Sequence, residues 1–236
     1  FQDLMSQYQE RHVFRLRSVE TFRGYIRNLL RFFGNLSLDE ITPSLIRQYQ
    51  EMRRRAVKPS TVNRDLATLR KAFNLAIEWE WVDVNPMKKV RLEPENNQRD
   101  RWLTQEEEVK LVAGCPRWLK EIVQFALGTG CRLGEILELQ WSGVDLERQV
   151  IIVLRSKNKQ HRTVPLNLGL VDLLLSKPNK NSQEFVFPNR LGQMRQVCNV
   201  SGNFRGVCLK AGITDLTFHD LRHSFASKLA QRGVDL

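Results

Sequence analysis

The chain is 236 residues long, with 42% hydrophobic and 27% charged residues, a composition typical of a globular protein that buries one large core or two smaller ones. It contains no run of eighteen apolar residues and no charged-then-apolar leader, which excludes a membrane-spanning helix and gives no indication of secretion. The 37 Lys and Arg residues outnumber the 26 Asp and Glu residues, and the formal charge of +11 favours a polyanionic partner, nucleic acid before membrane.

Residues 1–90 carry apolar residues at helical spacing in three stretches. The first stretch follows Ser18, which can cap a helix, and the second follows Thr42-Pro43, the cap-then-proline form of a helix start. The third opens at Ser60, and Asn85-Pro86 closes the region because the residue before a proline disfavours helical backbone. The pattern predicts a small helical bundle that forms the first domain.

The polar faces of this bundle hold a cluster of basic residues. They are Arg53, Arg54, Arg55, Lys58, Arg64, Arg70 and Lys71. For an isolated helix, a solvated charged face is the simpler interpretation. These residues therefore indicate a binding surface only in combination with motifs elsewhere in the chain.

Residues 91–101 are charged, lack periodicity and contain one proline, which predicts a linker. A second domain is expected over residues 102–236. It opens with a capping box formed by Thr104 and Glu107, preceded by an apolar residue. Another helix is expected over about residues 118–127 and ends at a glycine break.

The middle of the second domain predicts a short antiparallel sheet among helices. Residues 150–154 form a β-branched run, residues 163–166 are expected to be the returning strand, and residues 185–188 are a candidate third strand. The predicted fold class is therefore mainly α with a small antiparallel β-sheet. Helices are expected again over about 168–175, over 197–211 and from Thr217 onward.

Three polar motifs stand out in the second domain. Arg132 follows the glycine break, at the start of a new helix, and residues 155–162 form a basic turn between two β-like runs. His219 and Arg222 are three residues apart, so on a helix they share one face and can reach one small anionic group together. Guanidinium groups match phosphate oxygens through paired hydrogen bonds and stay charged at any relevant pH, which makes Arg132 and Arg222 candidate phosphate ligands.

In this order, the three motifs resemble the catalytic domain of the tyrosine recombinases, the phage-integrase family. Residues 1–90 are similar, more loosely, to that family's helical core-binding (SAM-like) domain. The resemblance implies two domains that form a C-shaped clamp round double-stranded DNA. It also implies site-specific integration or excision of a mobile element through a 3′-phosphotyrosyl intermediate, without a metal or a cofactor. The chain contains no Walker A loop and no cysteine spacing of a zinc site.

The resemblance also implies a role for each motif residue. Arg132 and Arg222 would bind the scissile phosphate, and His219 would hydrogen-bond it or assist removal of the proton from the nucleophile. Lys157 would be the general acid that protonates the 5′-hydroxyl leaving group, with Lys159 as the competing choice.

Three further residues have expected roles around these groups. Glu135, the acidic residue of the family's Arg-x-x-Glu pattern, would support the site rather than react. Lys159 and Arg162 would join the basic residues of the first domain as DNA contacts. Binding to duplex DNA should weaken as salt increases, because several phosphates would be neutralised together.

The attacking tyrosine of the family lies a few tens of residues beyond the His-x-x-Arg motif. This chain ends at Leu236, and its tyrosines, Tyr8, Tyr25 and Tyr49, all fall in the first domain. It also begins at Phe1 rather than Met. We therefore expect a fragment, monomeric by itself, that holds DNA without cutting it. The full-length protein would act as a homotetramer on DNA, in the cytoplasm of a bacterial or phage-infected cell.

Three other functions fit parts of the pattern. A type IB topoisomerase shares the Arg-Lys-Arg-His chemistry, but the helical first domain with its basic turns favours the recombinase. A DNA-binding relative without activity is disfavoured by the intact set of Arg132, Lys157, His219 and Arg222. A basic helical protein with no specific partner is disfavoured by the three ordered motifs.

Overall fold

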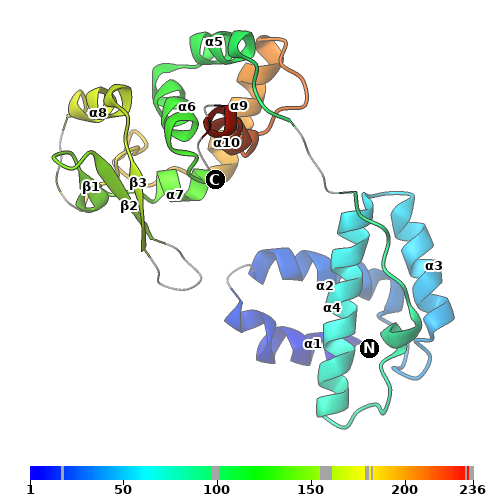
Figure 1. The fold of residues 1–236 in the computed structure, drawn as a ribbon. Coiled ribbons are helices and arrows are strands. Elements are labelled where there is room, and N and C mark those ends of the chain that lie inside the picture. The colour runs from blue at the N-terminus through cyan, green and yellow to red at the C-terminus, as the bar shows by residue number, and fades with distance from the viewer. Residues whose placement is uncertain are drawn as a thin grey trace. The chain divides into compact units, whose positions relative to one another are not determined.

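The computed structural model describes residues 1–16, 19–96, 101–154, 161–178, 181, 183–231 and 233 (Figure 1). The chain divides into two compact units, Phe1–Gln98 and Arg99–Leu236. Each unit has a hydrophobic core of its own. The expected fold class is confirmed, since helices dominate and the described strands form a small antiparallel sheet.

The first unit consists of four α-helices and two short 3-10 turns within the described residues. The helices are α1 (Gln2–Arg11), α2 (Val19–Phe33), α3 (Pro43–Arg54) and α4 (Pro59–Glu78), and the turns span Val13–Arg15 and Pro86–Lys89. The start of α3 follows the expected chemistry, because the Thr42 hydroxyl accepts a hydrogen bond from the Leu45 amide at 3.3 Å and Pro43 occupies the first helical position. Ser18, the expected cap of α2, lies outside the described residues.

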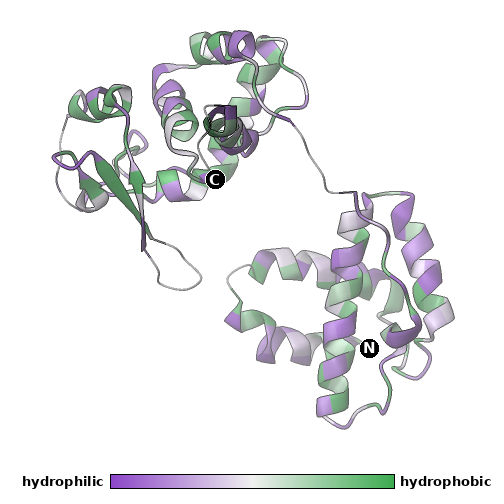
Figure 2. Ribbon diagram, viewed as in Figure 1, coloured by the Kyte–Doolittle hydropathy of each residue, from purple (hydrophilic) through white to green (hydrophobic). Residues whose placement is uncertain are grey.

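Aromatic side chains fill the centre of the first unit. Phe33 and Tyr49 pack with ring centroids 5.2 Å apart, and Phe73 from α4 is fully buried in the same core. In Figure 2, polar and apolar residues alternate along α3 and α4, as expected for helices with one buried face. The bundle therefore depends on the stripes that the sequence displays.

Residues 91–96, which the sequence assigned to the linker, lie against the first unit. The Asn63 side chain accepts a hydrogen bond from the Glu93 amide at 2.8 Å and donates one to the Glu93 carbonyl at 2.9 Å. Gln50 adds a hydrogen bond to the Arg91 carbonyl at 3.1 Å. Because Asn63 is buried and satisfies both backbone groups of one residue, it fixes this segment along α4.

The second unit places a short sheet among helices. Its helices are α5 (Gln105–Gly114), α6 (Arg117–Thr129), α7 (Leu133–Leu137), α8 (Leu168–Leu175), α9 (Val197–Lys210) and α10 (Asp220–Gln231), with a 3-10 turn at Trp141–Gly143. Its strands are β1 (Val144–Asp145), β2 (Val150–Leu154) and β3 (His161–Pro165). Figure 2 shows β2 and α8 as strongly hydrophobic elements.

The strands form an antiparallel sheet in the order β1-β2-β3. The β2–β3 hairpin pairs Val150 with Pro165 and Leu154 with His161. The expected third strand over residues 185–188 is wrong: Phe185 makes only an isolated bridge to Gln140, and the two-residue β1 takes the edge of the sheet instead. The segment after Phe185 turns inward, where Val186 and Phe187 are buried in the core.

Helix α6 lies at the centre of the second unit and packs against α5, α8 and α10 (Figure 1). It ends at Gly130, whose φ of 62° is a left-handed conformation that glycine adopts without strain. A Cβ atom at this position would lie 2.4 Å from a ring carbon of Phe225 on α10, so the close approach of α10 also requires glycine. Across the described residues, no helix has both the length and the hydropathy needed to cross a membrane.

Candidate functional site

The loop that joins α6 to α7 presents Arg132. Arg132 occupies the N-cap position of α7, and the Glu135 carboxylate accepts hydrogen bonds from the Arg132 backbone amide at 2.8 Å and from its guanidinium Nη1 at 3.0 Å. The Arg132 side chain remains 57% exposed. Glu135 therefore fixes both the backbone and the side chain of this arginine, and its supporting role in the chemistry stays a prediction.

Arg222 holds the same loop from the other side. Its Nη1 donates a hydrogen bond to the Gly130 carbonyl at 2.6 Å, which joins α10 to the end of α6. His219 lies one residue before α10, in the turn that the Asp220 carboxylate caps by accepting hydrogen bonds from the Thr217 amide and hydroxyl at 2.7 and 2.8 Å. The His-x-x-Arg motif is therefore fastened at both of its ends.

Three of the four predicted catalytic residues meet in one pocket. Arg132, His219 and Arg222 line a cavity of about 780 Å³, whose other walls come from α9 and from residues 213–218. The pocket is electropositive, because three arginines, Arg132, Arg205 and Arg222, and one carboxylate, Asp215, line it. An arrangement of this kind can bind one phosphate group from two directions and bring an imidazole against it.

The pKa of His219 is lowered from its ordinary value of 6.5. Partial burial is the main cause, and the positive charges of His223, Arg222 and Arg132 add to it. The ring of His219 contacts the ring of His223 with centroids 5.3 Å apart. His219 is therefore neutral at pH 7, with one ring nitrogen able to donate a hydrogen bond and the other able to accept one.

Lys157 and Lys159, the two candidates for the general acid, lie outside the described residues. The strands on either side of them, β2 and β3, are described and pair in register up to Leu154 and His161. Their assignment as general acid or DNA contact therefore stays a prediction.

Arg162, predicted as a DNA contact, points into the second unit from β3. Its Nη2 donates a hydrogen bond to Glu135 at 2.7 Å and contacts the Cys131 sulfur at 3.5 Å, and its side chain is only 20% exposed. The strand pattern gave no indication of which way this side chain would face. The structure therefore places Arg162 behind Arg132, within the protein.

The predicted DNA contacts of the first unit are of two kinds, half-buried side chains and exposed ones. Arg53 is half-buried, and its Nε donates a hydrogen bond at 2.9 Å to Asp65, a fully buried carboxylate that also accepts a hydrogen bond from the Tyr49 hydroxyl at 2.9 Å. Arg54 lies 3.8 Å from Glu93 with most of its side chain exposed. Of the other basic residues, Arg55, Lys58 and Arg64 are exposed, and Arg70 and Lys71 are half-buried.

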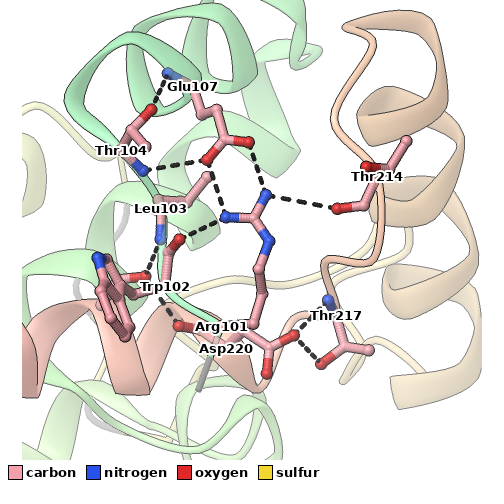
Figure 3. A network of polar contacts seen from close by, with 9 residues as sticks. Arg101, Trp102, Leu103, Thr104, Glu107, Thr214, Thr217 and Asp220 are labelled. Carbon is pink, nitrogen blue, oxygen red and sulfur yellow. Dashed lines mark hydrogen bonds and ion pairs between the residues drawn. The ribbon is translucent and has the colours of Figure 1, made fainter. Parts of the chain in front are cut away.

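A network centred on Arg101 reaches Thr214, one of the residues that line the pocket (Figure 3). The Arg101 guanidinium binds both oxygens of Glu107, at 2.9 and 2.6 Å, and donates to the Thr214 carbonyl at 3.4 Å. Glu107 also closes the expected capping box with Thr104. The hydrogen bonds from Arg101 lower the pKa of the Glu107 carboxyl.

Arg101 was missed at the sequence level, because it sits at the end of the expected linker. The capping box at Thr104 and Glu107 was the only signal in that region, and it does not reveal a second partner of Glu107. In the structure, Arg101 binds the segment that leads into His219, and the Leu103 amide donates to Ser224 on α10 at 2.8 Å. The start of the second unit therefore fixes the same loop and helix that carry His219 and Arg222.

Among the described residues, no group of three or more His, Cys, Asp or Glu side chains is placed to hold a metal ion. Cys115, Cys131 and Cys208 are buried as free thiols, and Cys198 is an exposed free thiol.

Comparison with known proteins decides the family. The phage integrase family model matches residues 101–236, and the model of the phage integrase N-terminal domain matches residues 1–92. The chain belongs to the phage integrase family. The resemblance seen in the three motifs is thereby confirmed, and the pocket lies in the part of the chain that matches the first of these models.

Individual members of the phage integrase family are also similar to the chain. The integrase of Salmonella phage P22 is 31% identical over 173 residues, which are 67% of this chain and 44% of that protein. The shufflon-specific DNA recombinase of Escherichia coli is 32% identical over 213 residues, which are 84% of this chain and 53% of that protein. The chain thus spans about half the length of these two relatives.

Solved structures of integrases share the fold. A lambda integrase dimer bound to a COC′ core site aligns with a TM-score of 0.85 at 20% identity, covering 99% of this chain and 90% of that one. The Tn1549 transposon integrase in complex with circular intermediate DNA aligns with a TM-score of 0.79 at 21% identity, covering 99% and 87%. The α-helical units and the small sheet are therefore those of known integrases.

Proposed function

We propose that this chain is the DNA-binding and phosphate-activating part of a tyrosine site-specific recombinase, which integrates or excises a mobile element through a 3′-phosphotyrosyl intermediate. The convergence of Arg132, His219 and Arg222 on one pocket is the observation that carries the proposal. These three side chains come from two segments far apart in the sequence, and specific hydrogen bonds to Glu135 and Gly130 hold them.

The chemistry follows from where charge develops. Attack on a phosphodiester increases the negative charge on its non-bridging oxygens, and fixed guanidinium groups stabilise that charge more than they stabilise the ground state. Arg132 and Arg222 would supply this stabilisation. Neutral His219 would hydrogen-bond the phosphate or receive the proton of the nucleophile, and Lys157 would protonate the 5′-hydroxyl leaving group, as the family resemblance implies.

The nucleophile in this proposal is a tyrosine outside these 236 residues. Tyr8 and Tyr49 are buried in the first unit, and burial raises the pKa of Tyr8 to about 12. The Tyr49 hydroxyl is also committed to Asp65. Tyr25 lies on α2, where its ring packs against Phe22. We expect this polypeptide alone to bind duplex DNA and to leave it uncut.

Partner and assembly are proposed on the same basis. One similar structure is a lambda integrase tetramer bound to a Holliday junction, which supports a tetramer on DNA for the natural protein. We propose that the chain of 236 residues alone is a monomer. The natural protein would act in the cytoplasm of a bacterial or phage-infected cell, where its DNA substrate is found.

The proposal can be tested by measuring the affinity of the chain for duplex DNA as salt is raised. If the basic surface neutralises six or more phosphates, raising salt from 50 to 200 mM should weaken binding on the order of a thousand-fold. An affinity that does not change with salt would contradict it. In the natural protein, relaxation of a supercoiled plasmid that lacks any special site would indicate a topoisomerase instead of a recombinase.

A further inference from the structure

Arg162 and Arg132 share one carboxylate. The Arg132 guanidinium donates a hydrogen bond to Glu135 Oε1 at 3.0 Å, and the Arg132 backbone amide donates one to Oε2 at 2.8 Å. Arg162 Nη2 donates a hydrogen bond to the same Oε2 atom at 2.7 Å. One anionic group therefore lies between two guanidinium groups, one of which is 57% exposed and the other 20% exposed.

This sharing has an electrostatic consequence for Arg132. Burial opposes ionisation of Glu135, but the amide of Arg132 and the two guanidinium groups outweigh it, and the pKa of the carboxyl is lowered. Without Arg162, the partly buried Glu135 carboxylate would keep Arg132 as its one ion-pair partner among the described residues. It would then draw the Arg132 guanidinium onto both of its oxygens and away from the pocket.

Arg162 also contacts a side chain of the loop that presents Arg132. It contacts the sulfur of Cys131, the residue between Gly130 and Arg132, at 3.5 Å. Arg222 donates a hydrogen bond to the Gly130 carbonyl at 2.6 Å, and the Glu135 carboxylate accepts one from the Arg132 amide at 2.8 Å. Every residue of the α6–α7 loop that precedes the helix is therefore held by a different side chain, and β3 supplies one of the three.

A direct DNA contact would require Arg162 to abandon these partners. If Arg162 moved away, the partly buried Glu135 carboxylate would lose one of its basic partners. A single phosphate contact at a solvated surface stabilises too little to offset that loss. The geometry therefore gives Arg162 a function different from that of an exposed basic residue of the same sheet region, such as Arg148, whose side chain is 84% exposed.

We propose that Arg162 is a positioning residue that orients Arg132 toward the phosphate by holding Glu135 and Cys131 from β3, and that it does not itself contact DNA. The consequence for phosphate chemistry rests on the proposed function, whereas the effect on Arg132 does not. Arg162 lies on β3, so its side chain also links the β2–β3 hairpin to the α6–α7 loop.

The first experiment follows the Nε–Hε signal of Arg132 by NMR in the DNA-free chain, with assignment by its loss in Arg132→Lys. In Arg162→Gln, this signal should move away from its wild-type position, with partial return in Arg162→Lys, which keeps the charge but not the paired geometry. Arg148→Gln is the matched control and should leave the signal unchanged. An unchanged Arg132 signal in a folded Arg162→Gln variant would overturn the proposal. If Arg162→Gln does not fold, the same comparison is made with Arg162→Lys.

The second experiment measures duplex affinity against salt for the same variants and for Glu135→Gln. If Arg162 acts through Glu135, adding Arg162→Gln to Glu135→Gln should change affinity less than two-fold, and the salt slope should not fall. If Arg162 contacted a phosphate, Arg162→Gln would instead weaken duplex affinity by a similar factor in the wild-type and Glu135→Gln backgrounds. It would also reduce the salt slope by about one. Failure of the wild-type chain to bind duplex would remove the proposed function, but the NMR result on Arg132 would stand.

Discussion

His219 is the residue of the pocket whose charge is most easily changed. Its lowered pKa means that the folded protein resists protonation of this imidazole, while the unfolded chain does not. The stability that follows from this difference is complete above the unfolded pKa of about 6.5 and is lost as pH falls through the folded value. Protonation in the folded state would add a positive charge to those of the arginines that line the pocket.

We therefore predict that acidification strengthens DNA binding through His219. Duplex affinity should rise as pH falls through the lowered pKa of His219, and this part of the rise should vanish in His219→Gln. An NMR titration of the DNA-free chain should place the midpoint of His219 below 6.5, and added duplex should raise it, because phosphate favours the charged form. A midpoint at or above 6.5 would show that burial and the nearby arginines do not control this group.

A second prediction at this scale separates catalysis from binding. In the natural protein, Arg132→Ala and Arg222→Ala should each reduce strand cleavage by about 10²–10³-fold, since their contacts strengthen in the transition state. Duplex affinity should change only a few-fold. The control is Arg117→Ala, whose side chain is 88% exposed at the start of α6. Equal losses of cleavage and affinity would argue against transition-state roles for the two arginines.

The two kinds of basic residue in the first unit give a third prediction. Arg53→Ala leaves Asp65, which is fully buried, without its cationic partner and should lower the free energy of unfolding by about 3 kcal/mol. Arg55→Ala, at an exposed position, should change it by less than about 0.5 kcal/mol but should reduce the salt slope of duplex binding. Urea unfolding and anisotropy titrations of both variants measure the contrast. Similar unfolding free energies would mean that the Asp65 pair contributes little.

At the scale of elements, the contact between α6 and α10 shapes the pocket. It brings Arg222 to the Gly130 carbonyl, and it places the Phe225 ring where a side chain at residue 130 would lie. The end of α6 and the pocket wall at Arg222 therefore depend on the same glycine. Arg101 and Ser224 reinforce the arrangement by fastening the start of the second unit to the loop before α10 and to α10 itself.

The glycine at this contact provides a fourth prediction. Gly130→Ala should lower the free energy of unfolding by about 2 kcal/mol or more, because alanine is strained at a φ of 62° and its Cβ meets Phe225. Gly202→Ala, in α9 with no atom within 4 Å of the added carbon, should instead raise it by about 0.5–1 kcal/mol. Urea denaturation of the two variants gives the comparison. A neutral effect of Gly130→Ala would show that α10 can move away from α6 at little cost.

At the scale of the whole molecule, residue patterns predicted the parts that local chemistry determines. The glycine break before Arg132, the Thr104 capping box and the β-branched run over 150–154 each appear in the structure as expected. The helix Gln2–Arg11 was not anticipated, although its buried residues Leu4, Met5 and Tyr8 have helical spacing, because polar residues dominate the rest of the segment.

The features that sequence reasoning missed depend on contacts between distant segments. The strand expected over 185–188 has the right residue types, but the edge of the sheet is taken by Val144–Asp145, which is too short to give a pattern. Arg162 resembles any other basic residue of a turn until its distance to Glu135 is known. Arg101 likewise shows its role only through Thr214, which lies 113 residues further along the chain.

The hydrogen bond between Arg222 and Gly130 joins residues that are 92 positions apart. During synthesis, a ribosome adds about 5–20 residues per second, so the α6 end would wait on the order of 5–20 s for its partner. A nascent chain at that stage already displays Arg132, yet it lacks the hydrogen bond from Arg222 that holds the Gly130 carbonyl. The pocket that we propose to bind phosphate is thus completed late in translation, and a polypeptide released early would lack its Arg222 wall.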